Sequence, residues 1–418
     1  DLIQEVLARI PEHRVQDVIL FDPADVDYPF GLNLFECKNL NDPKLVDRVC
    51  SEIILTFKKL FPDNWGPRME DLMRHSVLTL IATPDCTLLD MLSLLTHEEA
   101  RKQYAARTSD PVLRHYWQQA FPDNRRNQGE WVSSSLNKIG RFLTNPVIRN
   151  IVAQPKSTFD FRSIMDEGKV LLVNLSKGQL GEDNSGLIGS VLIGKILIAA
   201  LSRSEVPPEK RRPFHLIVDE YHSFATESFP TLQSEGRKFG IDTIVAHQYR
   251  DQLDTLNKGS TLNVGNFILF RLTGRDAEQM AMQFDNSPPD PEPLLKSVPY
   301  RTGREGVYRT GGDKVLVKGS SRSYGDVANE TANYLANVPN YRAYTKLIEG
   351  TELAEYFIQT EPCQVKERPE IAQRIKQNSR RLARSRQEVE ASVVNRFAPI
   401  LSTDGAGPKA LIYEMDDP

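Results

Sequence analysis

The spacing of apolar residues changes along the chain of 418 residues. Leu2–Ile10 has helical spacing, and Asp17–Pro23 contains a short apolar run that ends in a proline, which is typical of a buried strand. From about Pro43 to Gln154 the apolar residues recur with helical periodicity, and no convincing strand interrupts them. We therefore expect the edge of an α/β domain followed by an inserted all-helical domain.

Strands and helices alternate after this helical block. A long apolar helix is expected at Ser185–Ser202, and a second helix at Phe229–Phe239. The expected strands are Gly168–Asn174, Phe214–Glu220, Asp242–Ala246 and Asn266–Arg271. Alternation of this kind predicts a mostly parallel sheet that is covered by helices on both faces.

The last part of the chain has a different composition. Ser287–Asn329 is rich in Pro, Gly, Arg and Ser and predicts a loop, although Lys314–Lys318 has the pattern of a small strand. Glu367–Phe397 predicts one highly charged helix, followed by a flexible tail. The predicted domain plan is residues 1–42 for the front of the α/β domain, 43–155 for the all-α insert, 156–360 for the rest of the α/β domain, and 361–418 for the charged helix and tail.

Composition limits the classes of protein that fit. The net charge of -4 gives no general basic character, so any contact with nucleic acid has to come from a local surface. Four scattered cysteines without a CxxC pair disfavour a zinc site and a disulfide framework and favour a reducing cytoplasm. Leu187–Leu201 is the longest apolar stretch, but glycines and Lys195 interrupt it, so we interpret it as a buried helix.

The expected strand Phe214–Glu220 ends in two acidic residues, Asp219 and Glu220, at its C-terminal tip. In P-loop ATPases, a strand tip of this kind places Asp219 in the Mg²⁺ shell and Glu220 beside the attacking water. An ordinary buried strand that runs into an acidic turn has the same pattern. The motif therefore needs support from other residues.

Polar residues at the next helix and strand ends supply that support. Gln248 follows the strand Asp242–Ala246, where it could sense a γ-phosphate or orient water. Arg237 could reach the nucleotide of a neighbouring subunit and neutralise charge in the transition state. The structural alternative for Arg237 and Lys238 is a cationic helix end before a Gly240 cap.

The order of these motifs resembles the TraG/TraD-type coupling ATPases of conjugation and type IV secretion, which are related to the HerA and FtsK DNA translocases. The segments that carry the resemblance, besides the acidic strand tip, are Asp1–Pro11, Val170–Gly178 and Asn263–Glu278. The resemblance implies an α/β fold with a RecA-like, mostly parallel P-loop ATPase sheet and an inserted all-α domain.

The resemblance also implies the roles of individual residues. Asp219 and Glu220 correspond to the Walker B pair, Gln248 to the glutamine after the next strand, and Arg237 to an arginine finger that acts in trans. ATP and Mg²⁺ are the implied cofactors. The implied partners are DNA, the relaxase and other type IV secretion components, and further copies in a hexameric ring, in the cytoplasm or at the inner face of the membrane.

The sequence departs from the family in one respect, because it contains no qualifying G-x-x-x-x-G-K-[ST] loop. Gly189–Lys195 has the spacing, but Ile196 replaces the hydroxyl residue and the segment lies inside an apolar helical run. In the family this loop precedes the segment that resembles Asp1–Pro11. We therefore expect the loop, and any membrane anchor, upstream of residue 1, and we expect the fragment alone to bind ATP poorly.

Two other functions remain open at this stage. The missing loop favours a non-hydrolysing docking protein for relaxase or secretion substrates, whereas the combination of Asp219, Glu220, Arg237 and Gln248 disfavours it. A HerA-like DNA-repair translocase is the third possibility, which the helical insert disfavours.

Several other polar and aromatic residues have simpler explanations. The basic run of the last helix is expected to form a solvated face more readily than a DNA contact. His222 and His247 have no metal-ligand partners at useful spacing, and Tyr116, Trp117 and Trp131 are expected to be core aromatics. The basic run consists of Arg374, Lys376, Arg380, Arg381, Arg384 and Arg386.

Overall fold

The computed structural model describes residues 2–122, 125–284, 307–310, 313–316 and 324–403. The chain divides into two compact units. Unit 1 comprises residues 1–216, 223–243 and 366–418, and unit 2 comprises residues 217–222 and 244–365. These units do not follow the four predicted segments, whose roles as domains stay a prediction.

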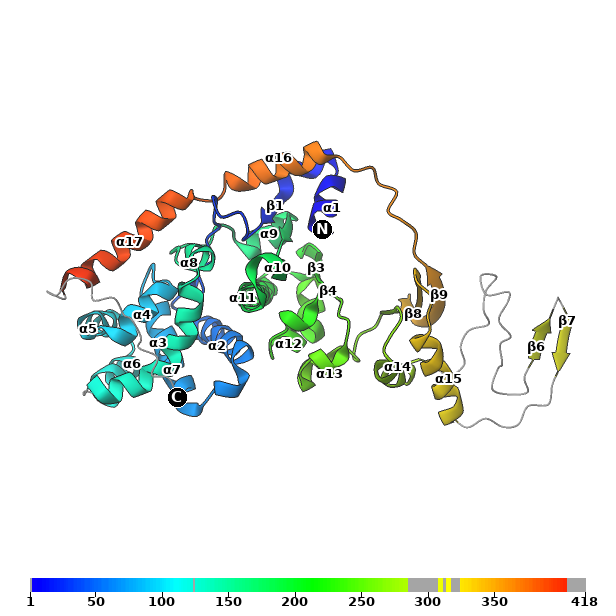
Figure 1. The fold of residues 1–418 in the computed structure, drawn as a ribbon, viewed down its shortest axis with the longest axis horizontal. Helices are drawn as coiled ribbons and strands as arrows, with labels where there is room; N and C mark the ends of the chain where they lie inside the picture. The colour runs from blue at the N-terminus through cyan, green and yellow to red at the C-terminus, as the bar shows by residue number, and fades with distance from the viewer. Residues whose placement is uncertain (1, 123–124, 285–306, 311–312, 317–323, 404–418) are drawn as a thin grey trace, which may run out of the picture. The chain divides into compact units, whose positions relative to one another are not determined.

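Unit 1 contains the expected helical block (Figure 1). Its first helix begins where Asp42 accepts hydrogen bonds from the N–H groups of Lys44 and Leu45, and Thr87 and Asp90 form a capping box on another helix. No strand occurs among the described residues between Pro43 and Gln154. The helices are α2 (Pro43–Leu60), α3 (Pro67–Ile81), α4 (Leu88–Thr96), α5 (Glu98–Arg107), α6 (Pro111–His115), α7 (Arg125–Leu143) and α8 (Pro146–Val152).

Two of the aromatic residues of this block lie in its core, as expected. Tyr116 and Trp117 are buried, and Trp117 Nε1 donates a hydrogen bond to Thr79 Oγ1 at 2.8 Å. Tyr116 stacks on His75 with ring centroids 3.7 Å apart. Because the two rings pack inside the helical block, they are not available to stack on bases.

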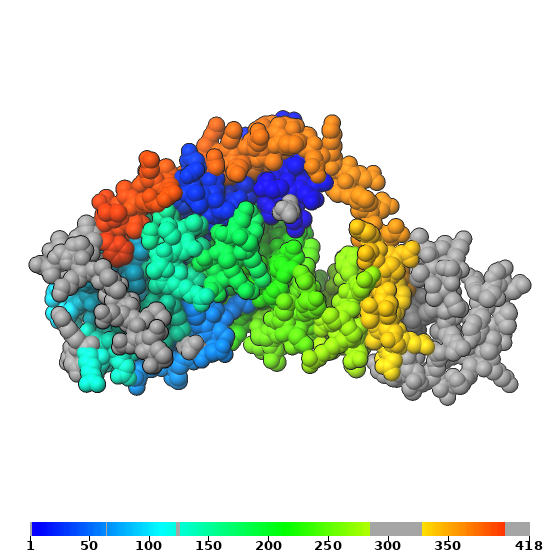
Figure 2. Space-filling model, in the orientation of Figure 1, coloured from blue at the N-terminus to red at the C-terminus, as the bar shows by residue number. Residues whose placement is uncertain are grey.

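The α/β part of unit 1 begins with a parallel strand pair. β1 (Val18–Phe21) pairs with β2 (Val170–Val173), with Val18 opposite Val170. α1 (Leu2–Arg9) and α16 (Pro369–Arg380) pack beside β1, and α16 lies along this N-terminal segment in Figures 1 and 2. The core that they share consists of Leu7, Val15, Val18, Leu20, Ile371 and Ile375.

The long apolar helix is α11 (Glu182–Ser202), which follows α9 (Phe161–Glu167) and α10 (Lys177–Leu180). By length and composition it could cross a membrane, but 78% of its apolar window is buried within the protein. Glycines allow close packing on both sides, because a Cβ on Gly189 would lie 2.2 Å from Phe224 and one on Gly194 would lie 3.2 Å from Glu52. The expectation of a buried core helix is confirmed.

A second strand pair follows α11. β3 (Phe214–Val218) and β4 (Ile241–Val245) are neighbours, with α12 (Phe229–Glu235) between them in sequence. Phe214 N–H donates to the Gly240 carbonyl and Ala246 N–H donates to the Val218 carbonyl, each at 2.9 Å. The residue numbers of the bonded partners increase in the same direction along both strands, so the two strands run parallel. The boundary between the units crosses this pair.

The rest of unit 2 is built on an antiparallel sheet. β5 (Phe267–Leu269) pairs with β8 (Arg342–Glu349), which pairs with β9 (Glu352–Gln359). α13 (Thr255–Ser260) precedes this sheet, and α14 (Gly274–Ala281) and α15 (Tyr324–Ala336) supply Met280 and Leu335 to the core beneath it. β6 (Val307–Thr310) and β7 (Asp313–Leu316) form a hairpin.

Two expectations from the sequence are wrong. The strand at Asn266–Arg271 does not extend the parallel pairs, because β5 takes an antiparallel partner from the unpredicted hairpin β8–β9. The charged C-terminal helix is two helices, since Ser385 and Glu388 form a new capping pair that begins α17 (Arg386–Thr403). Most of the predicted loop at Ser287–Asn329, and the tail after residue 403, lie outside the described residues.

Candidate functional site

Glu220 has a strained backbone at the carboxyl end of β3. Its φ is +50°, a left-handed conformation that among the described non-glycine residues occurs elsewhere at Asp85 and Tyr341. The pairing with β4 continues past this point, because Tyr221 N–H donates to the Ala246 carbonyl at 2.9 Å. A left-handed glutamate costs about 1 kcal/mol or more, and strain of this kind clusters at functional sites.

The predicted residues Asp219, Glu220 and Gln248 lie together in unit 2. Gln248 Nε2 donates to Glu220 Oε1 at 2.8 Å, and His222 Nε2 lies 3.6 Å from Glu220 Oε2. Asp219 Oδ1 accepts the Glu220 N–H at 2.9 Å, and the Asp219 side chain is exposed. The pairing of β3 with β4 thus joins side chains that are 28 residues apart in sequence.

The residues below this strand tip are held firmly. Tyr221 is fully buried, and its O–H donates to Asn257 Oδ1. Burial raises the pKa of Tyr221, so its hydroxyl stays a donor at neutral pH. Asn257 in turn donates from its backbone N–H to Asp254 Oδ1 at 2.9 Å. A rigid support therefore lies directly after the strained glutamate.

The surroundings of Asp219 fit a Mg²⁺ ion that keeps water and phosphate ligands better than a metal ion bound entirely by protein side chains. Among the described residues, no group of three His, Cys, Asp or Glu side chains forms a closed metal site. Mg²⁺ commonly binds one or two carboxylates and completes its shell with water and substrate phosphates. An exposed carboxylate beside Glu220 fits that pattern, and Asp219 is the residue that would hold the ion.

Arg237 lies in unit 1, on a short 3-10 turn at Gly236–Phe239. Its side chain is exposed. Gly240 follows in the left-handed conformation with φ of +73°, and its N–H donates to the Arg237 carbonyl at 3.1 Å. The glycine cap of the structural alternative is therefore present, and the Arg237 side chain is exposed to solvent.

Comparison with known proteins places this geometry in context. No family model matches the chain. The chain is 23% identical over 180 residues to the type 4 coupling protein DotL of Legionella pneumophila, a match that covers 38% of this chain and 23% of DotL. The plasmid coupling protein TrwB in complex with ADP and Mg²⁺ matches with a TM-score of 0.53 and 15% identity, over 88% of this chain and 78% of that chain.

This chain resembles type 4 coupling proteins in sequence and in fold. Unbound TrwBdeltaN70, a bacterial conjugative coupling protein, gives a TM-score of 0.51 at 14% identity, with the same coverage of 88% and 78%. The resemblance predicted from the sequence is confirmed, and so is the α/β fold class with its RecA-like part and all-α part. The match to DotL spans about a quarter of that protein's length.

The glycine-rich segment at Gly189–Lys195 is not the phosphate loop of such a coupling-protein fold. It lies in the interior of α11, where backbone N–H groups bond within the helix. Burial lowers the pKa of Lys195 to about 8, and its Nζ lies 3.9 Å from Glu36 Oε2. Neither backbone nor lysine is presented to an anion, so the sequence-based rejection of this segment is confirmed.

Arg250 is a structural residue of the site that the sequence did not reveal. Its buried guanidinium donates to the Lys258 carbonyl at 2.8 Å and to Thr261 Oγ1 at 2.9 Å. These bonds fix the segment that begins at Gln248. Burial, together with the nearby Arg250 charge, lowers the pKa of His247. A charged residue in a polar loop gives no sequence signal of burial.

Much of the C-terminal basic run pairs within the chain. Arg374 lies 2.8 Å from Glu12, Arg380 lies 2.6 Å from Asp25, and Arg386 lies 2.7 Å from Glu390. Intramolecular pairing of this kind favours the solvated-face interpretation over a DNA contact.

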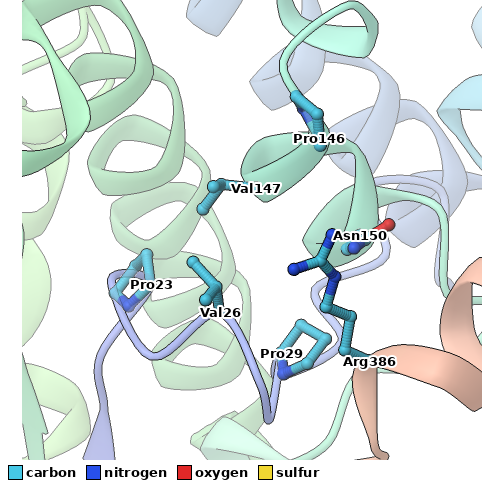
Figure 3. Close-up of a pocket in the computed structure, with 7 residues that line it drawn as sticks. All are labelled: Pro23, Val26, Pro29, Pro146, Val147, Asn150 and Arg386. Atoms are coloured by element: carbon cyan, nitrogen blue, oxygen red, sulfur yellow. The ribbon is translucent and has the colours of Figure 1, made fainter.

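A small pocket lies between the loop after β1, the start of α8 and the first residue of α17 (Figure 3). Its volume is about 140 Å³. Ligand pockets usually reach roughly 300 Å³ or more, and this one contains none of the predicted site residues. Its lining residues are Pro23, Val26, Pro29, Pro146, Val147, Asn150 and Arg386.

Proposed function

We propose that this chain is the helical and Walker B part of an ATPase that drives DNA into a type IV secretion channel. The observation that carries the proposal is the strained Glu220, bound by Gln248 and adjacent to the exposed Asp219. A relative with the same fold, TrwB, has been solved with ADP and Mg²⁺. Backbone strain at an acidic residue outside the core costs stability, and that cost is explained if the residue acts on a substrate.

Each residue has a distinct task in this proposal. Asp219 would hold a Mg²⁺ ion, which would supply positive charge beside the nucleotide phosphates. Glu220 accepts a proton from the attacking water, while Gln248 keeps the carboxylate and that water in line. Arg237 of a neighbouring subunit neutralises charge on the transferring phosphoryl group.

The partners follow from the same proposal. A finger that acts in trans requires further copies of the chain, and a hexameric ring is the arrangement implied by the family resemblance. The similarity to DotL and TrwB, which are coupling proteins, supports DNA and secretion components as partners. The site of action would be the cytoplasm or the inner face of the membrane.

The test uses the full-length protein, with Glu220→Gln compared with Glu227→Gln. Glu220→Gln removes the base but keeps the shape and one acceptor oxygen, so ATP should stay bound while DNA-stimulated turnover falls by about 10²–10⁴-fold. Glu227 pairs with Lys58 on the surface, so its variant should keep normal turnover. Normal turnover of Glu220→Gln would show that the assigned base is wrong.

A docking protein without hydrolysis is the second candidate function. The observation that favours it is the absence of a qualifying phosphate loop from the sequence. ATP affinity of the full-length protein separates the two: micromolar binding that requires Mg²⁺ supports the ATPase, whereas no binding together with retained relaxase capture supports the docking protein.

A further inference from the structure

The turn that carries Arg237 is bonded to two other arginines of unit 1. Arg203 Nη1 donates to the Phe239 carbonyl at 2.9 Å, and Arg211 Nη1 donates to the neighbouring Lys238 carbonyl. The Arg211 guanidinium also lies 5.8 Å from the centre of the Phe239 ring. Two consecutive carbonyls of one short turn are thus bound by charged donors.

Arg203 is the more deeply placed of the two. It follows the last residue of α11, and its side chain is 0% exposed. Its Nη2 donates to the Arg212 carbonyl at 2.5 Å, and its Nε lies 3.1 Å from Asp166 Oδ1. A planar guanidinium that donates to two carbonyls and lies beside a carboxylate has little freedom to move. The Phe239 carbonyl is therefore tied to the end of the core helix.

Arg211 connects the same helix end to the turn by a second route. Its Nε donates to the Val206 carbonyl at 2.8 Å and to the Arg203 carbonyl at 3.1 Å. The turn then passes close to both arginines, since a Cβ on Gly240 would lie 3.4 Å from Arg203 Nη1 and from Arg211 Cβ. The backbone on which Arg237 sits is held from one side by this pair.

The Arg237 side chain differs from these two. It is exposed, and the described part of the chain gives its guanidinium no hydrogen bond or ion pair. An arginine that has to meet a phosphoryl group on another subunit gains from a fixed backbone, because a misplacement of about 1 Å can lower a rate by about 10²-fold. A fixed backbone and an unengaged guanidinium occur together at this turn.

We propose that Arg203 and Arg211 are positioning residues for Arg237, which they serve by fixing the turn Gly236–Phe239. The inference rests on the proposed role of Arg237 as a finger that acts in trans. It assigns to Arg203 and Arg211 an effect on the rate of hydrolysis at the neighbouring subunit's site.

The first experiment compares Arg211→Ala with Arg212→Ala in the full-length protein. Arg211 is partly exposed, so its loss spares the core, whereas Arg212 is the adjacent arginine and donates to the Glu167 carbonyl instead of the turn. We expect Arg211→Ala to lower kcat by roughly 10- to 100-fold with the KM for ATP within about twofold. Arg212→Ala should stay within about threefold of the wild type.

The second experiment mixes subunits and separates positioning from a folding defect. Arg211→Ala subunits keep Glu220, and Glu220→Gln subunits keep an intact Arg237 turn, so interfaces that pair the two should regain hydrolysis. No recovery in the mixture, or an equal loss in Arg212→Ala, overturns the positioning role.

Arg237→Ala distinguishes this inference from the proposed function. Loss of turnover in Arg237→Ala with normal turnover in Arg211→Ala overturns the positioning role alone. Normal turnover in Arg237→Ala overturns the finger itself and, with it, the inference. The double variant should be no slower than Arg237→Ala, because both changes remove the same interaction.

Discussion

The two parallel strand pairs end in different ways. β1 runs from an apolar strand into Asp22, whose Oδ1 accepts hydrogen bonds from Ala24 N–H and from Asn174 Nδ2, both at 3.2 Å. β3 runs from an apolar strand into Asp219, which stays exposed and is followed by the left-handed Glu220. The two ends share a sequence pattern but differ in what the acid contacts.

The acids at the two strand ends differ in the groups that contact them. At Asp22, backbone and side-chain donors shape the turn and connect it to the end of β2. At β3, a single side-chain donor reaches Glu220 Oε1, and the backbone is held in a costly conformation that leaves Asp219 open to solvent. Asp22 is half-buried and its Oδ1 accepts two hydrogen bonds, whereas the exposed Asp219 accepts the Glu220 N–H at Oδ1.

The largest expected effect separates the two aspartates by activity. In the full-length protein, Asp219→Asn should lower turnover by about 10²-fold and raise the Mg²⁺ concentration needed, because it removes a charged ligand. Asp22→Asn keeps the acceptor oxygen and should leave turnover within about threefold. An equal loss in both variants, measured across a Mg²⁺ titration, would mean that the comparison of the two ends is mistaken.

The next effect separates them by stability. Asp22→Ala removes two hydrogen bonds from a half-buried turn and should lower the free energy of unfolding by about 1–2 kcal/mol in urea denaturation. Asp219→Asn, which keeps its acceptor for the Glu220 N–H, should change it by less than about 0.5 kcal/mol. The opposite ranking would contradict the assignment of Asp22 as the structural acid.

The smallest effect measures the strain itself. Glycine adopts the left-handed conformation without a Cβ penalty, so Glu220→Gly should raise the free energy of unfolding by roughly 0.5–1 kcal/mol while it abolishes turnover. Glu227→Gly, at a residue without positive φ, serves as the control and should not be stabilising. A less stable Glu220→Gly protein would argue that the glutamate is held mainly for structure.

Local features of the fold could be predicted because short-range chemistry determines them. Asp42 before Pro43 and the Thr87–Asp90 capping box begin helices that periodicity alone already indicates. The short apolar runs of β1 to β4 also predict strands. Which strand pairs with which cannot be read in the same way, because residues distant in sequence decide it. β5 illustrates this, since its partner β8 lies about 75 residues later and was not predicted.

At the candidate site, too, local features could be predicted from the sequence and long-range contacts could not. The acidic strand tip and Gln248 were predicted from their order along the chain, and their catalytic roles stay predictions. The contact between Gln248 and Glu220 depends on the β3–β4 register, and the positive φ of Glu220 depends on the structure around it. The buried guanidiniums of Arg203 and Arg250 could not be predicted, because arginine in a loop is ordinarily solvated.

The glycines of α11 have a mechanical consequence. Gly186 lies against Leu60 and Gly194 against Glu52, both on α2, while Gly189 accepts the ring of Phe224, four residues after Glu220. Because no side chain lies between these surfaces, the contacts of α11 with α2 and with Phe224 are stiff, and close-packed interiors transmit strain instead of absorbing it. A displacement of α2 would therefore be passed by α11 to the chain at Phe224 and not absorbed between them.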